Sequence, residues 1–134
     1  MAFVLDASIA ACWLLPDETH AVATAALERL AREPAVAPTI WWYEIRNLLL
    51  SCERRGRFGA DRTEAALGVL TGLPITIEPV TDAPDLLELA RRHRLSSYDA
   101  AYLALARHRN LALATLDGAL ATAARAEQVR LVGA

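Results

Sequence analysis

The chain has 134 residues, close to the commonest size of a single domain, and 54% of them are hydrophobic. Its net charge is −2 at pH 7 and all 14 basic residues are arginine, so any binding of nucleic acid must depend on local arginines rather than on a bulk positive field. No apolar stretch reaches the roughly 20 residues of a membrane span, and the apolar N-terminus lacks the basic segment of a signal peptide, so we expect one cytoplasmic domain over residues 1–134 without membrane association.

Short apolar runs alternate with amphipathic segments along the whole chain. We predict strands at residues 2–5, 35–37, 75–80, 111–115 and 129–132. We predict helices at residues 8–15, 17–32, 39–55, 61–70, 82–93, 96–109 and 117–126. Ser8, Thr39, Asp82 and Ser96 or Ser97 are the expected N-caps, with Gly56 and Asn110 beyond two helix ends. This alternation predicts an α/β fold, with a parallel sheet covered by helices on both faces.

Four acidic residues adjoin or interrupt apolar segments: Asp6, Glu44, Asp99 and Asp117. Asp6 and Asp117 directly follow predicted strands, at the sheet edge where ligands bind in such folds. Glu44 borders the apolar stripe of its helix, and Asp99 shares a helical face with apolar residues. An unpaired carboxylate in such a setting is costly, and a chain without lysine has only arginine or a metal ion to pair with it. The pattern therefore indicates a divalent-metal site for Mg²⁺ or Mn²⁺, which prefer carboxylate and water oxygens.

Three of these acids also have a purely structural interpretation. Asp6 and Asp117 could each cap the helix that follows, and Asp99 lies in the first turn of its helix, where the macrodipole favours a negative charge. Glu44 has the weakest such explanation, because it lies in the middle of a helix. Both interpretations stay open for the other three acids.

Four segments together resemble the PIN domain family, and specifically the VapC-type toxin ribonucleases of bacterial toxin–antitoxin pairs. They are residues 4–8 (VLDAS), Glu44 with Asn47 and Leu48, residues 97–106 (SYDAAYLALA) and residues 115–117 (TLD). The resemblance implies a sheet of five parallel strands in the order 3-2-1-4-5. It also implies an endoribonuclease that depends on Mg²⁺ or Mn²⁺, is usually a homodimer, cuts structured RNA such as tRNA or ribosomal RNA, and is blocked by an antitoxin protein.

By the same resemblance the four acids would hold the metal, directly or through water. The metal would polarise the phosphoryl oxygen and lower the pKa of the attacking water. Ser8 and Thr115 would orient carboxylates or water, and Asn47 continues the polar side of the Glu44 helix. RNA contacts are expected from two clusters near helix ends, Arg54 with Arg55 and Arg91 with Arg92, although arginines there also complement the helix dipole. The candidates for stacking on bases are Trp13, Trp41, Trp42, Tyr43 and Tyr102, of which Trp41 also suits the core or an antitoxin groove.

Two competing functions fit the sequence less well. Phosphoryl transfer through an aspartyl-phosphate would suit Asp6 as nucleophile, but such sites use a lysine to neutralise the phosphate and this chain has none. A P-loop is excluded because the chain contains no GxxxxGK[ST] segment. A non-catalytic RNA-binding or interaction module would not need four crowded carboxylates. Cys12 and Cys52 show no metal-binding spacing and are expected to be core residues.

Overall fold

A central parallel sheet organises the computed structural model, which describes residues 1–15, 17–80 and 83–133. Its strands are β1 (Phe3–Leu5), β2 (Ala35–Ala37), β3 (Ile75–Ile77) and β4 (Ala112–Ala114). They are paired in the order β3-β2-β1-β4, and every pairing is parallel. The α/β fold with a parallel sheet is therefore confirmed, with four strands instead of five. The fifth predicted strand is reduced to one parallel bridge, which joins Leu131 to Leu113 at the outer side of β4.

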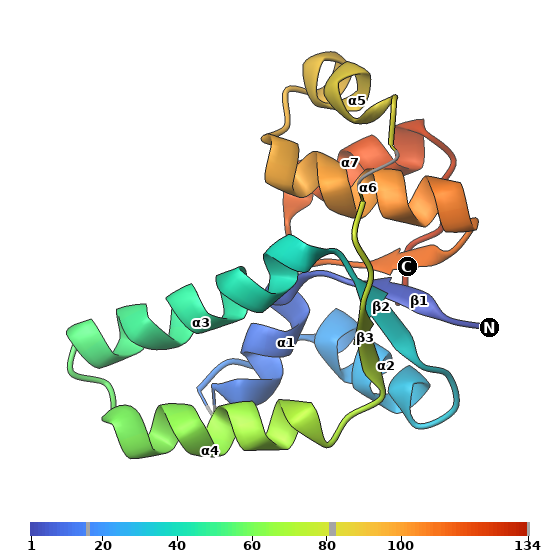
Figure 1. Ribbon diagram of the computed structural model, residues 1–134. Coiled ribbons are helices and arrows are strands. Elements are labelled where there is room, and N and C mark those ends of the chain that lie inside the picture. The colour runs from blue at the N-terminus through green and yellow to red at the C-terminus, as the bar shows by residue number, and fades with distance from the viewer. Residues whose placement is uncertain (16, 81–82, 134) are drawn as a thin grey trace.

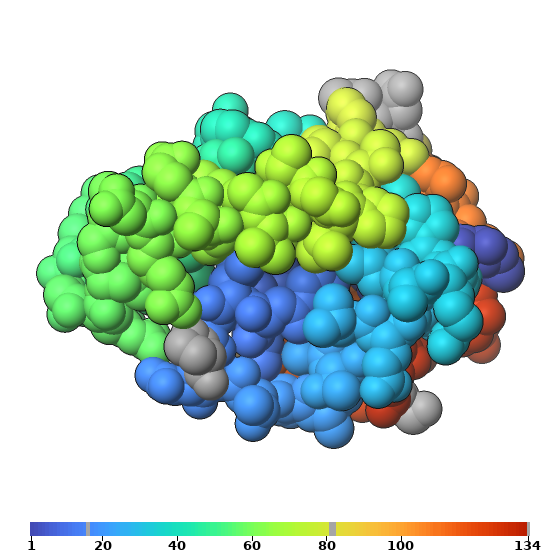
Figure 2. Space-filling view, turned by 90° about the horizontal axis from the view of Figure 1, so that it is seen from below, coloured from blue at the N-terminus to red at the C-terminus, as the bar shows by residue number. Residues whose placement is uncertain are grey.

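Seven helices among the described residues surround this sheet. They are α1 (Ala7–Leu14), α2 (Ala21–Leu30), α3 (Thr39–Arg54), α4 (Ala60–Thr71), α5 (Leu86–His93), α6 (Ser97–Arg109) and α7 (Gly118–Ala126). Figure 1 shows α5 and α6 on one side of the sheet, α1, α2 and α4 on the other, and α3 and α4 extending sideways as a hairpin. Seen from below in Figure 2, the surface consists mostly of the α1–α2 region in blue and the α3–α4 hairpin in green. No helix in the described part of the chain is long and apolar enough to cross a membrane.

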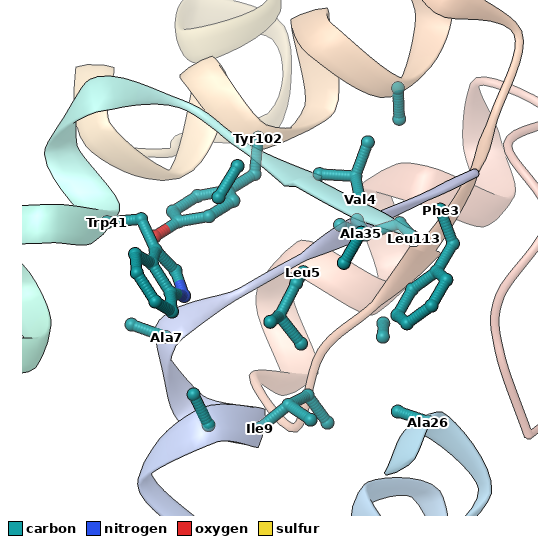
Figure 3. Packing of buried hydrophobic residues seen from close by; sticks show 14 of the residues in the cluster. Phe3, Val4, Leu5, Ala7, Ile9, Ala26, Ala35, Trp41, Tyr102 and Leu113 are labelled. Carbon is teal, nitrogen blue, oxygen red and sulfur yellow. The ribbon is translucent and has the colours of Figure 1, made fainter. Parts of the chain in front are cut away.

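The core follows from the apolar strands. All three residues of β1 are fully buried, and β2 and β4 are buried along their whole length. Figure 3 shows Phe3, Val4 and Leu5 of β1 surrounded by side chains of the neighbouring strands and helices. Cys12 and Cys52 are buried and free, so their predicted place in the core is confirmed.

Several predicted helix starts are wrong by a few residues, and in each case a tertiary contact or a neighbouring residue explains the difference. The first helix begins at Ala7, so Ser8 lies in its first turn and does not cap it, because the Ser8 hydroxyl is bonded to groups outside the helix. The helix α2 begins at Ala21 instead of residue 17, since His20 Nδ1 accepts a hydrogen bond from Val22 N.

Three further predictions concern helix ends. Pro38, not Thr39, occupies the N-cap position of α3. Ser96 does cap α6, because its hydroxyl accepts a hydrogen bond from Asp99 N at 3.1 Å. Asn110 ends that helix in the left-handed conformation (φ 52°), as predicted. Asp82, the predicted N-cap of the helix before it, lies outside the described residues.

Candidate active site

Parallel strands bring two of the predicted acids to one edge of the sheet. The chain leaves β1 at Asp6 and leaves β4 at Thr115, and the Asp6 amide donates a hydrogen bond to the Ala114 carbonyl at 3.0 Å. This bond holds the carboxyl ends of the two strands together. Asp117 follows two residues after Thr115 and occupies the N-cap position of α7.

Asp6 has the most complete set of hydrogen bonds among the four acids. Its Oδ2 accepts a hydrogen bond from Thr115 Oγ1 at 2.6 Å and another from Ser8 Oγ at 2.8 Å. These two hydroxyls are held in turn by the backbone, since Leu116 N donates to Ser8 Oγ and Asp117 N donates to Thr115 Oγ1, both at 3.0 Å. Asp6 stands at the N-cap position of α1 but makes no capping hydrogen bond with its side chain, so helix capping does not explain it.

Glu44 comes to the same region from the middle of α3. Its Oε1 accepts a hydrogen bond from the hydroxyl of Tyr102 on α6 at 2.5 Å. The Tyr102 side chain is fully buried. Sequence reasoning missed this contact and considered Tyr102 for base stacking, which its burial contradicts. The available signal was a lone hydroxyl inside the apolar run of residues 100–106, because a buried tyrosine normally finds a hydrogen-bond partner.

Asp99 and Asp117 are held less tightly. Asp99 is half-buried in the first turn of α6, where its backbone amide is engaged by Ser96. Asp117 is exposed, and its Oδ2 accepts a hydrogen bond from Leu120 N at 2.8 Å, which caps α7. The structural interpretation of Asp117 as a helix cap is therefore correct, and it leaves the second carboxylate oxygen unused by the cap.

Burial and mutual repulsion raise the pKa of three of these acids. Burial has the largest effect on the pKa of Asp6, with a smaller upward contribution from Asp117, against the lowering effect of the Thr115 and Ser8 hydrogen bonds. Burial likewise raises the pKa of Glu44, helped by the charges of Asp6 and Asp99. The pKa of Asp99 is raised by burial first and then by Asp117 and Asp6. Because each acid acts on at least one other, the four carboxyl groups form one electrostatic cluster.

The donor chemistry of this cluster fits a hard divalent cation. Within the described residues no arginine, histidine or N-terminal amine forms an ion pair with any of the four acids. In residues 1–15, 17–80 and 83–133, no three histidine, cysteine or acidic side chains surround one point closely enough to enclose a metal ion. Mg²⁺ is usually bound by one or two carboxylates and keeps several waters, so this open arrangement suits it better than a closed cage would.

The other candidate residues lie away from the acids or are otherwise engaged. Asn47 is exposed on α3. Arg54 and Arg55 are exposed at the far end of the same helix, about 15 Å beyond Glu44 at 1.5 Å per residue. Arg91 is exposed, whereas Arg92 forms ion pairs with Glu88 at 2.6 Å and Glu127 at 2.7 Å.

The aromatic candidates separate into core and surface residues. Trp41 is buried, in agreement with its predicted place in the core, and the partly buried Trp13 donates a hydrogen bond to the Ala23 carbonyl. Trp42 and Tyr43 are exposed and pack edge to face with ring centroids 5.1 Å apart. Only this exposed pair retains an open ring face for stacking among the five aromatic candidates with described side chains.

Comparison with known proteins identifies the fold. The family model described as PIN domain matches residues 3–126. The solved structure of PAE2754 from Pyrobaculum aerophilum is similar, with a TM-score of 0.68 and 23% identity over 92% of this chain and 87% of that one. VapC20 of Mycobacterium tuberculosis, described as a sarcin–ricin loop cleaving toxin, has a TM-score of 0.61 and 22% identity over 90% of this chain and 94% of its own.

A toxin–antitoxin complex from Klebsiella pneumoniae is also similar, with a TM-score of 0.58 and 19% identity over 83% of this chain and 82% of that one. No curated protein matches the sequence. At these identities the structural neighbours establish a shared fold.

Proposed function

Because this chain belongs to the PIN domain family, we propose that it is a VapC-type endoribonuclease that depends on Mg²⁺ or Mn²⁺ and acts as the toxin of a type II toxin–antitoxin pair. The family match covers nearly the whole chain, so the proposal applies to the domain as a unit. Among the structural neighbours, one is described as a toxin that cleaves the sarcin–ricin loop and another as a toxin–antitoxin complex, which supports structured RNA as the substrate and an antitoxin as the partner.

One observation carries the proposal. Three of the four acids use one carboxylate oxygen for a hydrogen bond from the protein: Asp6 Oδ2, Glu44 Oε1 and Asp117 Oδ2. Each hydrogen bond fixes the direction of the carboxylate and leaves the second oxygen free for a ligand. Carboxylates that served only the fold would be expected to meet arginines, since this chain has 14 of them.

In this proposal Asp6, Glu44, Asp99 and Asp117 hold the cation directly or through water. A bound divalent cation would supply the charge that stabilises the scissile phosphate and lowers the pKa of an attacking water. The chain's own contribution is orientation: Ser8 and Thr115 hold Asp6, and the α7 amide of Leu120 holds Asp117. Asn47 and the arginines Arg54, Arg55, Arg91 and Arg92 lie further out, where they would meet RNA outside the reacting phosphate.

An RNA cleavage assay with and without EDTA tests the proposal. Cleavage should require the metal, and Asp6→Asn or Asp99→Asn should abolish it, while the exposed Asp61→Asn, on α4, should cleave like wild type. The products should carry a 5′ phosphate and a 3′ hydroxyl, because water attacks the phosphate. Cyclic phosphate ends, or full cleavage in EDTA, would contradict the metal mechanism.

The antitoxin and the homodimer are separate parts of the proposal. Light scattering during gel filtration should give twice the 14.5 kDa chain mass for a homodimer. Co-expression with the neighbouring small reading frame should yield a complex without ribonuclease activity. A monomer, or an active complex, would remove the corresponding part and leave the nuclease proposal to the cleavage assay.

A further inference from the structure

Tyr102 has a feature that packing alone does not require. Its side chain is fully buried, and its hydroxyl donates to Glu44 Oε1 across 58 residues of sequence. The other buried residues of α6 are Ala100, Leu103, Ala104, Leu105 and Ala106, all apolar. Figure 3 shows the ring reaching from α6 toward α3, with the hydroxyl directed at the region of Trp41. A phenylalanine would fill the same volume, so the hydroxyl needs its own explanation.

Glu44 is the site acid whose direction the backbone controls least. Asp6 and Asp117 follow strands and have short side chains, whereas Glu44 leaves the middle of α3 on a side chain with three rotatable bonds. Holding such a side chain in one conformation costs up to about 1.5–2 kcal/mol of rotamer entropy. The nearest arginine on the same helix does not help, because Arg46 Nη1 donates to the Trp42 carbonyl and its guanidinium lies 3.3 Å from the centre of the Trp42 ring.

A hydroxyl that donates to a carboxylate forms a short, charge-assisted hydrogen bond, and the 2.5 Å distance belongs to this class. Because Tyr102 is inaccessible to solvent, water does not compete for its proton. The contact therefore fixes Oε1 and turns Oε2 away from the tyrosine. Residues three apart lie on one helical face, so the same face of α6 carries Asp99 and the donor that orients Glu44.

We infer that Tyr102 is a positioning residue of the metal site: its hydroxyl holds Glu44 so that the second carboxylate oxygen is presented to a divalent cation. This inference depends on the metal-dependent function proposed above. Residues that orient metal ligands in this way typically change metal affinity by about 10–100-fold when they are replaced. Tyr102→Phe, which keeps the ring and removes the hydroxyl, should therefore weaken Mn²⁺ binding by about that factor.

The experiment measures Mn²⁺ binding to the full chain by titration calorimetry without RNA, and then the Mn²⁺ concentration that gives half-maximal cleavage. Tyr98→Phe is the matched control, because Tyr98 lies on the same helix and is 58% exposed. This control should bind Mn²⁺ within about twofold of wild type, a difference smaller than the effect expected of Tyr102→Phe. Tyr102→Phe should need correspondingly more Mn²⁺ for half-maximal cleavage and should approach the wild-type rate at saturation.

A second arm separates positioning from a general effect on the fold. In a Glu44→Ala background, Tyr102→Phe should change Mn²⁺ affinity by less than about twofold, because the group it positions is gone. An equal loss in both backgrounds would show that Tyr102 acts through the fold, and an unchanged affinity of the single variant would refute its positioning role. Wild-type protein that does not bind Mn²⁺ would refute the proposed function as well, so the two failures are distinguishable.

Discussion

Replacement of Asp6 by asparagine should stabilise the protein in the absence of metal and remove its response to metal. Asp6 is 5% exposed and has no positively charged partner among the described residues. Burial of such a charge costs several kcal/mol, on the order of 3–4. The asparagine oxygen can still accept the Ser8 and Thr115 hydrogen bonds, but each becomes weaker by about 1 kcal/mol because the acceptor is neutral. The net gain is about 1–2 kcal/mol.

Thermal unfolding in EDTA at pH 7.5 measures this gain. For a domain of this size about 1 kcal/mol corresponds to about 4 °C in Tm, so Asp6→Asn should melt about 4–8 °C above wild type. With Mg²⁺ or Mn²⁺ at 100 times its Kd, wild type should gain about 2.7 kcal/mol, or about 11 °C, while the variant should gain much less.

The exposed Asp61, in the first turn of α4, provides the control. Asp61→Asn should change Tm by less than about 2 °C in EDTA, because surface substitutions usually stay within about 0.5 kcal/mol, and its response to metal should be that of wild type. The reasoning would be refuted if Asp6→Asn melted below wild type in EDTA, since burial of the charge would then not be costly. Equal stabilisation of both proteins by metal would remove Asp6 from the metal site.

Three further predictions concern pH, RNA and the fold. Relative to a variant with amides at the three acids of raised pKa, wild type in EDTA should lose unfolding free energy as pH rises above the ordinary carboxyl values of 3.8 and 4.5, because the folded state keeps protons that the unfolded chain has released; urea titrations check this. Replacing Arg54 and Arg55 by alanine should reduce the salt slope of single-stranded RNA affinity by up to about 1.4, and an unchanged slope would exclude phosphate contacts. Asn110→Ala should lower the unfolding free energy by about 1 kcal/mol, since alanine at φ 52° is strained, and Asn110→Gly should not show this loss.

The sequence predicted the parallel sheet and its helices because buried strands and amphipathic helices leave different periodicities. The fifth strand was overestimated for a physical reason: residues 129–132 are apolar, but only Leu131 reaches the ladder beside β4. The start of α2 was misplaced because a histidine cap has no strong signal in sequence, and residues 17–20 are as polar as a helix surface.

Helix capping was a competing explanation for Asp6 and Asp117, and the structure separates them. Asp117 does cap α7, whereas Asp6 occupies the N-cap position and directs its carboxylate to Ser8 and Thr115. Sequence position alone could not distinguish the two, because both acids directly precede a helix after a strand. What decided the matter is a hydrogen bond between residues 109 positions apart, and periodicity reports which face a residue occupies without naming its partner.

The site depends on several elements that are distant along the chain. Asp6 follows β1, its two donors come from α1 and from the end of β4, and Glu44 is held by α6. The segment of residues 97–106 contributes twice, since Asp99 enters the cluster and Tyr102, three residues later on the same face, orients Glu44. A helix that only covered the sheet would need neither a carboxylate nor a buried hydroxyl at these positions. The spacing of this segment is therefore set by the site and not by the helix, and this accounts physically for its distinctive share of the resemblance to the family.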